Sequence, residues 1–174
     1  MDQSVSNDLP IANYQSELPV RAGLLAGVVG SLAIMVVVTA LLIITGRDIW
    51  TAARLIATVV YGPEASEGFL PIVIGTIIHL VTGGVLGAIF GRIMPSMPRG
   101  FWLVPGLMYG VAAWILSSFV ILPVVAPSTI QADANIEVLL LAHVVYGLNL
   151  GLAGASYGLW WHLPSWLESG TENR

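Results

Sequence analysis

Two histidines, His79 and His143, have a residue type and surroundings that could support chemistry in an apolar environment. Each begins the pattern H-x-x-x-G-x-x-x-G, which reads His-Leu-Val-Thr-Gly-Gly-Val-Leu-Gly from His79 and His-Val-Val-Tyr-Gly-Leu-Asn-Leu-Gly from His143. Imidazole can ligate haem iron, exchange protons near neutral pH and form strong hydrogen bonds. What the two rings do here depends on the elements that carry them.

Three interpretations of this pair are open. In the first, each neutral ring bonds a backbone carbonyl or a hydroxyl group of the next helix and fills the space beside a glycine. In the second, the rings are the two axial ligands of a b-type haem. In the third, the pair takes up and releases protons along a proton or ion pathway. Helix packing is preferred, because histidines near glycines form a pattern of low specificity and no basic residue for haem propionates lies near their depth.

Four long stretches with no charge at their centres carry these residues. Of the 174 residues, 56% are hydrophobic and 9% are charged, whereas an ordinary soluble domain has about 25% charged residues. A helix needs about 20 apolar residues to cross a bilayer. Four segments meet this requirement, namely residues 20–44, 69–93, 101–125 and 138–161. We therefore predict an all-α fold, an integral membrane four-helix bundle over residues 20–162, with polar tails at residues 1–19 and 163–174.

The segments around the spans carry interfacial signals. Residues 48–60 have helical periodicity and place Trp50 and Arg54 four residues apart. An aromatic ring and an arginine both anchor well at a membrane surface, so we predict a short interfacial helix there. Pro105 is expected in the first turns of the third span, and His162, beside two tryptophans, is expected at the interface.

Arginine placement predicts the orientation. The side of both termini has Arg21, Arg92, Arg99 and Arg174, and the other side has Arg47 and Arg54. Because short cytoplasmic loops are enriched in basic residues, we predict that both termini lie in the cytoplasm.

The histidine pattern also indicates an internal repeat. The first and third spans correspond loosely, because Arg21 precedes Gly23 and Gly27 as Arg99 precedes Gly106 and Gly110. The chain therefore reads as a duplicated two-helix hairpin whose halves enter the membrane from the same side, which is a parallel repeat.

Small residues are expected to hold the helices together. Glycines four apart share one helix face and let backbones approach closely. The glycines predicted to pack helices are Gly75, Gly83, Gly87, Gly91, Gly147 and Gly151. Polar residues within spans usually bond a neighbouring helix, and this is predicted for Thr82, Ser117, Ser118 and Asn149.

Several functions are excluded or disfavoured by composition. The net charge is −4, there is no lysine and the arginines are scattered, so no nucleic-acid partner is expected. Cysteine is absent, which excludes thiolate metal sites and cysteine nucleophiles. No Walker A, H-E-x-x-H or G-x-S-x-G motif is present, and no metal site or enzyme activity is expected.

Two segments carry a family resemblance. Residues 46–57 read Gly-Arg-Asp-Ile-Trp-Thr-Ala-Ala-Arg-Leu-Ile-Ala, and residues 142–151 read Ala-His-Val-Val-Tyr-Gly-Leu-Asn-Leu-Gly. Together they resemble small four-helix bacterial inner-membrane proteins classed as domains of unknown function, over residues 21–159. The resemblance implies a bacterial origin and a compact bundle, and it brings no activity and no assigned catalytic residue.

The leading functional hypothesis is a non-catalytic accessory or scaffold subunit of a larger membrane complex, with a respiratory or photosynthetic electron-transfer assembly as one candidate. A chain with so little mass outside the membrane has little with which to act alone. Its expected partners are the lipid bilayer and other transmembrane subunits, and no cofactor is expected. The alternatives are an electron carrier holding haem b between His79 and His143, and a small proton or ion pathway.

Overall fold

The computed structural model describes residues 15–16, 18–62, 65, 67–94, 96–125 and 136–161, and these residues are almost entirely helical. The elements in chain order are β1 (Gln15–Ser16), α1 (Val20–Ile44), α2 (Thr51–Tyr61), α3 (Leu70–Ile93), β2 (Met97–Pro98), the 3-10 helix η2 (Arg99–Phe101), α4 (Leu103–Leu116), the π-helix η3 (Ser117–Ile121), α5 (Leu122–Val125) and α7 (Ile136–Trp161). The predictions made for most of the N-terminal tail, for His162 and for the C-terminal tail lie outside the described residues.

Four helical segments are long and apolar enough to cross a membrane, and they confirm the predicted spans to within a few residues. They are Val20–Ile44, Leu70–Ile93, Arg99–Val124 and Ile136–Tyr157. Only 11% to 33% of the residues in their most apolar windows are buried inside the chain. Their outer faces are therefore apolar side chains, which water would solvate poorly and lipid solvates well.

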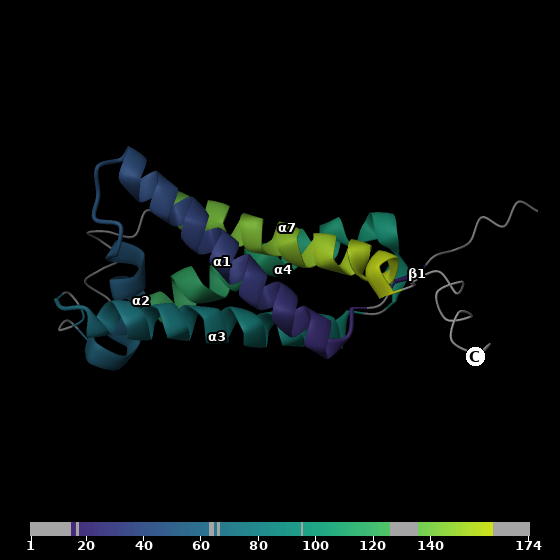
Figure 1. Cartoon of the computed structure of the whole chain (residues 1–174), viewed down its shortest axis with the longest axis horizontal. Coiled ribbons are helices and arrows are strands. Elements are labelled where there is room, and N and C mark those ends of the chain that lie inside the picture. Colours follow the sequence, from purple (N-terminus) through teal and green to yellow (C-terminus); the bar gives the residue numbers. More distant parts are fainter. Residues whose placement is uncertain are drawn as a thin grey trace, which may run out of the picture.

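The long helices lie side by side along the longest axis of the molecule (Figure 1). Helix α1 crosses the others obliquely and packs against both α3 and α7, while α4 packs against α7 and α2 packs against α3. Tyr109 of α4 and Tyr146 of α7 both reach α3, so the four spans form a closed bundle rather than a row. The two histidine-bearing helices, α3 and α7, both pack against α1.

The third span is interrupted, which differs from the single regular helix expected over residues 101–125. Five residues, Ser117–Ile121, form a π-helical segment between α4 and α5. Pro123 follows within α5 and lacks the N–H group that would bond the carbonyl four residues earlier, at Phe119. A wider turn next to such a proline is a usual way to accommodate the lost bond. Pro105 lies in the first turn of α4, as predicted.

Helix α2 is shorter than predicted and packs on the bundle. It begins at Thr51 rather than at residue 48, because Asp48 accepts a hydrogen bond from the Trp50 backbone N–H and pairs with Arg54. Trp50 therefore precedes the helix instead of sharing a face with Arg54. The two buried residues of helix α2 are Ala53 and Ala57. The backbone of both faces Gly75 of α3.

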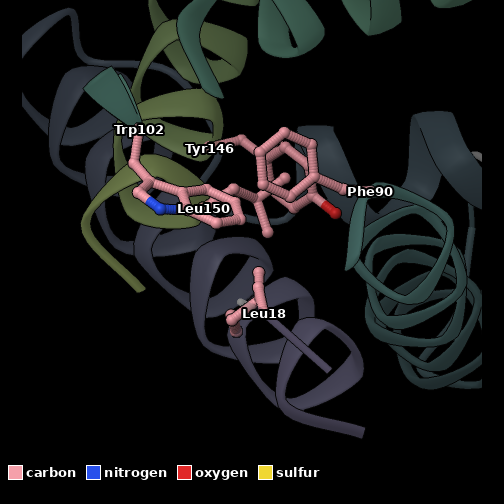
Figure 2. Close-up of a cluster of buried hydrophobic side chains, with 6 residues drawn as sticks. Leu18, Phe90, Trp102, Tyr146 and Leu150 are labelled. Atoms are coloured by element: carbon pink, nitrogen blue, oxygen red, sulfur yellow. The ribbon is translucent and has the colours of Figure 1, made fainter. Parts of the chain in front are cut away.

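The end of the bundle that holds the start of α1 is closed by a small strand pair and an aromatic core. β1 pairs antiparallel with β2, with Ser16 opposite Met97. The core cluster beneath it includes Leu18, Phe90, Trp102, Tyr146 and Leu150, drawn in Figure 2. Leu18 is only 3% exposed, so the expectation that residues 1–19 form a solvated tail is wrong for its last part, where a buried leucine and a paired strand belong to the folded body.

Candidate functional site

The glycines of α1 and α3 bring the backbones of these two helices into direct contact. A Cβ atom added at Gly27 would collide with the backbone carbonyl of Gly83, and one added at Gly23 would collide with that of Gly87. These contacts are backbone to backbone, so no side chain can relax to make room. Close glycine packing of this kind is the main way in which membrane helices gain van der Waals contact.

The same contact recurs between α4 and α7. A Cβ atom at Gly106 would collide with the carbonyl of Gly147, and one at Gly110 would collide with that of His143. Gly27 and Gly106 occupy matching places, since each faces the carbonyl of the first glycine and the Cα of the second glycine of its partner's H-x-x-x-G-x-x-x-G pattern. In the sequence comparison Gly106 corresponds to Gly23. In the structure the glycine of α1 that makes the matching contact is Gly27, which lies about one helical turn later.

The remaining glycines predicted to pack helices also serve contacts within the chain. Gly75 faces the carbonyl of Ala53 in α2, Gly91 faces the carbonyl of Leu18, and Gly151 faces Trp102 and Leu103. The glycine faces of the described spans are therefore used internally.

His79 bonds from α3 to the backbone of α1. Its Nε2 atom lies 3.2 Å from the carbonyl oxygen of Ser31. Because a carbonyl only accepts, the Nε2–H group donates. This hydrogen bond lies next to the glycine contact between the same two helices. A Cβ atom added at Gly83 would collide with the side chain of Ser31.

His143 connects α7 to the π-helical segment of the third span. Its Nδ1 lies 2.7 Å from the carbonyl oxygen of Leu139, one turn earlier in α7, and its Nε2 lies 3.1 Å from the hydroxyl oxygen of Ser117. With Nδ1–H donating to the carbonyl, Nε2 of the neutral ring accepts from the Ser117 hydroxyl. That hydroxyl is also 3.1 Å from the carbonyl of Trp114, so its single proton serves one acceptor at a time.

Three further polar side chains hold the helices together, and two of them were not singled out from the sequence. Tyr109 of α4 donates to the carbonyl of Leu86 in α3 at 2.8 Å, and Tyr146 of α7 donates to the carbonyl of Gly83 in α3. Asn149 of α7 donates to the carbonyl of Ala26 in α1 at 2.6 Å, as predicted. A tyrosine within an apolar helix near a glycine is the signal that would have identified the first two.

The prediction of an interhelical bond is wrong for two residues. Thr82 is exposed on the outer face of α3. Ser118 is 5% exposed, and its hydroxyl has no hydrogen-bond partner within the described part of the chain. Ser117, its neighbour, does bond His143. The π-helical turn thus directs one serine to a partner and buries the other without one.

The donor atoms of the two histidines do not fit paired haem ligation in this arrangement. Iron needs a free imidazole nitrogen, and both nitrogens of His143 face oxygen atoms of the chain. The Nε2 of His79 faces the Ser31 carbonyl. Among the described residues, no group of three or more His, Asp or Glu side chains is placed to hold a metal ion. The contacts of His79 with Ser31 and of His143 with Ser117 join two helices, and the contact of His143 with Leu139 lies within α7.

Four apolar helices of spanning length, joined by glycine contacts and interhelical hydrogen bonds, define a helical multi-pass membrane protein. The chain belongs to DUF6789, a family of unknown function whose profile matches residues 18–158. The matched region begins at the buried Leu18 and includes all four apolar segments. No curated protein and no solved structure matches the chain.

Proposed function

We propose that this protein is a non-catalytic accessory or scaffold subunit of a larger assembly in a bacterial inner membrane, with a respiratory or photosynthetic electron-transfer complex as one candidate. One observation carries this proposal. Five polar side chains within the spans form hydrogen bonds to another helix. Each of these bonds is made to a backbone carbonyl or to a hydroxyl group, and the five residues are His79, Tyr109, His143, Tyr146 and Asn149. An interior used in this way stabilises the bundle and leaves its outer surface for function.

The outer surface supports contact with other hydrophobic helices. The glycine faces are used within the chain, so a partner would meet large aliphatic side chains instead. Two of these exposed side chains are Val36 in the second half of α1, 70% exposed, and Val124 in α5, 81% exposed.

The orientation and the duplication belong to the same proposal. Arg21, Arg92 and Arg99 lie at the end of the bundle that holds β1 and β2, which supports a cytoplasmic location for that end. The matching places of Gly27 and Gly106 support a duplicated hairpin. Cysteine labelling tests the orientation, since Gly100→Cys should react with an impermeant thiol reagent only in opened cells and Glu67→Cys should react in intact cells. The reverse pattern would contradict it.

Photo-crosslinking in the native membrane tests the subunit proposal. A photoreactive residue at Val36 or Val124 should capture one defined transmembrane protein, which also co-purifies in fixed ratio after mild detergent extraction. The same residue at Tyr61 in α2, which is partly buried, is the control and should capture less. Recovery of the chain as a monodisperse monomer, with no position-dependent crosslink, would contradict the proposal.

The haem and proton-pathway alternatives have their own readouts. A reduced-minus-oxidised spectrum of the purified protein with Soret and α bands, lost in His143→Ala, would replace the subunit proposal with an electron carrier. Proton flux into liposomes that depends on both His79 and His143 would replace it with a pathway. We expect a colourless protein and no flux above that of empty liposomes.

A further inference from the structure

An apolar groove runs along the outer side of the contact between α1 and α3. It has a volume of about 330 Å³ and is lined by Val20, Leu24, Val85, Ala88, Ile89, Arg92 and Ile93. Six of these seven side chains are aliphatic, and the seventh, Arg92, lies in the last turn of α3. The groove is therefore hydrocarbon-like along its length, with a cation at one end.

The glycine contact explains why the groove exists. Gly23 and Gly27 bring the two backbones together, and Gly84 faces Leu24 and Val28 without a side chain of its own. Larger side chains form the two walls, with Leu24 of α1 43% exposed and Ile89 of α3 44% exposed. Ala88 is the smallest residue of the lining, so it keeps the groove open. An apolar groove of this size with a cation at one end matches an acyl chain that is joined to an anionic head group.

Within the described residues, no acidic side chain lies at the arginine end of the groove. Arg92 and Arg21 are exposed and make no hydrogen bond or ion pair within the described part of the chain. The acidic residues that the structure describes, Asp48, Glu67 and Glu137, all lie at the opposite ends of their helices or in the connection there. An arginine with free donors at membrane-surface depth recognises phosphate through paired hydrogen bonds.

We propose that this groove binds an anionic phospholipid. One acyl chain lies between α1 and α3 along Val20, Leu24 and Ile89, and the phosphate accepts hydrogen bonds from Arg92, with Arg21 adding positive charge beside it. Basic sites between membrane helices on the cytoplasmic side favour anionic lipid head groups in this way. The inference goes beyond the proposed subunit role and does not depend on it.

Lipid binding to the purified chain tests this site. Native mass spectrometry in detergent is used with phosphatidylglycerol and phosphatidylcholine of identical acyl chains. We expect phosphatidylglycerol to bind more tightly, and Arg92→Gln to lower its affinity about fivefold, the scale of one basic residue at an anionic surface. Arg47→Gln, the same charge change at the other end of α1, is the control and should keep the preference. Equal binding of the two lipids, or an unchanged preference in Arg92→Gln, would overturn the proposal.

A second variant tests the groove separately from the charge. Ala88→Phe fills the groove and keeps Arg92, so it should abolish the tight phosphatidylglycerol site, whereas Ala112→Phe on the exposed face of α4 should not. Glycerol phosphate, which has the head group but no acyl chain, should not compete. Competition by glycerol phosphate would mean a simple phosphate site and would overturn the proposal, as would full binding by Ala88→Phe. If Ala88→Phe does not fold, the Arg92→Gln comparison alone decides.

Discussion

The phenol of Tyr146 in α7 donates a hydrogen bond to the backbone carbonyl of Gly83 in α3. The ring of the same tyrosine packs against Gly30 of α1. One side chain, 2% exposed, therefore joins three helices. Gly83 is also the glycine whose carbonyl faces Gly27 of α1. A side chain from the second half of the chain thus reinforces the glycine contact between α1 and α3.

Removing this hydroxyl should weaken the bundle without emptying its core. Tyr146→Phe keeps the ring and loses the bond, and interhelical hydrogen bonds in membranes contribute about 0.6 kcal/mol on average, up to about 1.7 kcal/mol. We expect a loss near the upper figure, because the group is buried. Reversible unfolding in mixed detergent measures it. Tyr61→Phe, whose hydroxyl makes no bond among the described residues, is the control, and an equal effect of the two changes would contradict this role.

The glycine contact should be far less tolerant. Gly27→Ala places a methyl group against the Gly83 carbonyl, and only a backbone shift can relieve the clash. Overpacking costs about 1–3 kcal/mol, and we expect the upper end for Gly27→Ala and for its counterpart Gly106→Ala. Gly100→Ala, which meets nothing within 4 Å, should be neutral. The measurement is the same unfolding assay, and a Gly27→Ala protein as stable as the parent would contradict the contact.

Much of the architecture could be predicted from the sequence because lipid imposes strict demands. Backbone polar groups must be satisfied within each span, so long uncharged stretches can only be helices. For this reason α1, residues 20–44, begins and ends where expected. The glycines of the two histidine patterns also indicated close helix packing, because glycines spaced four apart in a membrane helix usually lie at a helix contact.

Other features needed the tertiary structure. Tyr109 and Tyr146 looked like ordinary members of apolar runs, and their acceptors lie on helices far away in the sequence. Leu18 sits beside polar residues, and its burial depends on the aromatic core formed by distant segments. The π-helical segment is different, since Pro123 was a visible signal for an irregular turn and could have been used.

The strand pair formed by β1 and β2 can be tested by a disulfide. Ser16 and Met97 are directly opposite in register, and Cα atoms across an antiparallel pair are about 4.5–5.5 Å apart, within disulfide range. The chain has no cysteine of its own, so Ser16→Cys with Met97→Cys should oxidise quantitatively, as measured by free-thiol titration. Ser16→Cys with Glu67→Cys joins opposite ends and should stay reduced. Equal oxidation of both pairs would contradict the fold at this end.

The contact between His143 and Ser117 should appear as an energetic coupling. In a double-mutant cycle of His143→Ala and Ser117→Ala, we expect a coupling of about 0.6–1.7 kcal/mol, the range for interhelical bonds in membranes. Ser156 bonds the carbonyl of Leu152 in its own helix, so His143→Ala with Ser156→Ala should be additive within about 0.5 kcal/mol. Additivity in the first cycle as well would mean that the imidazole and the hydroxyl do not interact.

The two adjacent serines of the π-helical segment should respond to alanine in opposite directions. Ser117→Ala removes the partner of His143 and should destabilise the protein, whereas Ser118→Ala removes a buried hydroxyl that has no partner among the described residues. Burying an unsatisfied polar group costs about 1–3 kcal/mol, so Ser118→Ala should be neutral or stabilise the bundle by about 1 kcal/mol. Unfolding of the two variants in the same detergent makes the comparison. If Ser118→Ala instead costs as much as Ser117→Ala, the Ser118 hydroxyl must bond a group outside the described chain, and the π-helical turn would then be the place to look for a bound water, lipid or partner helix.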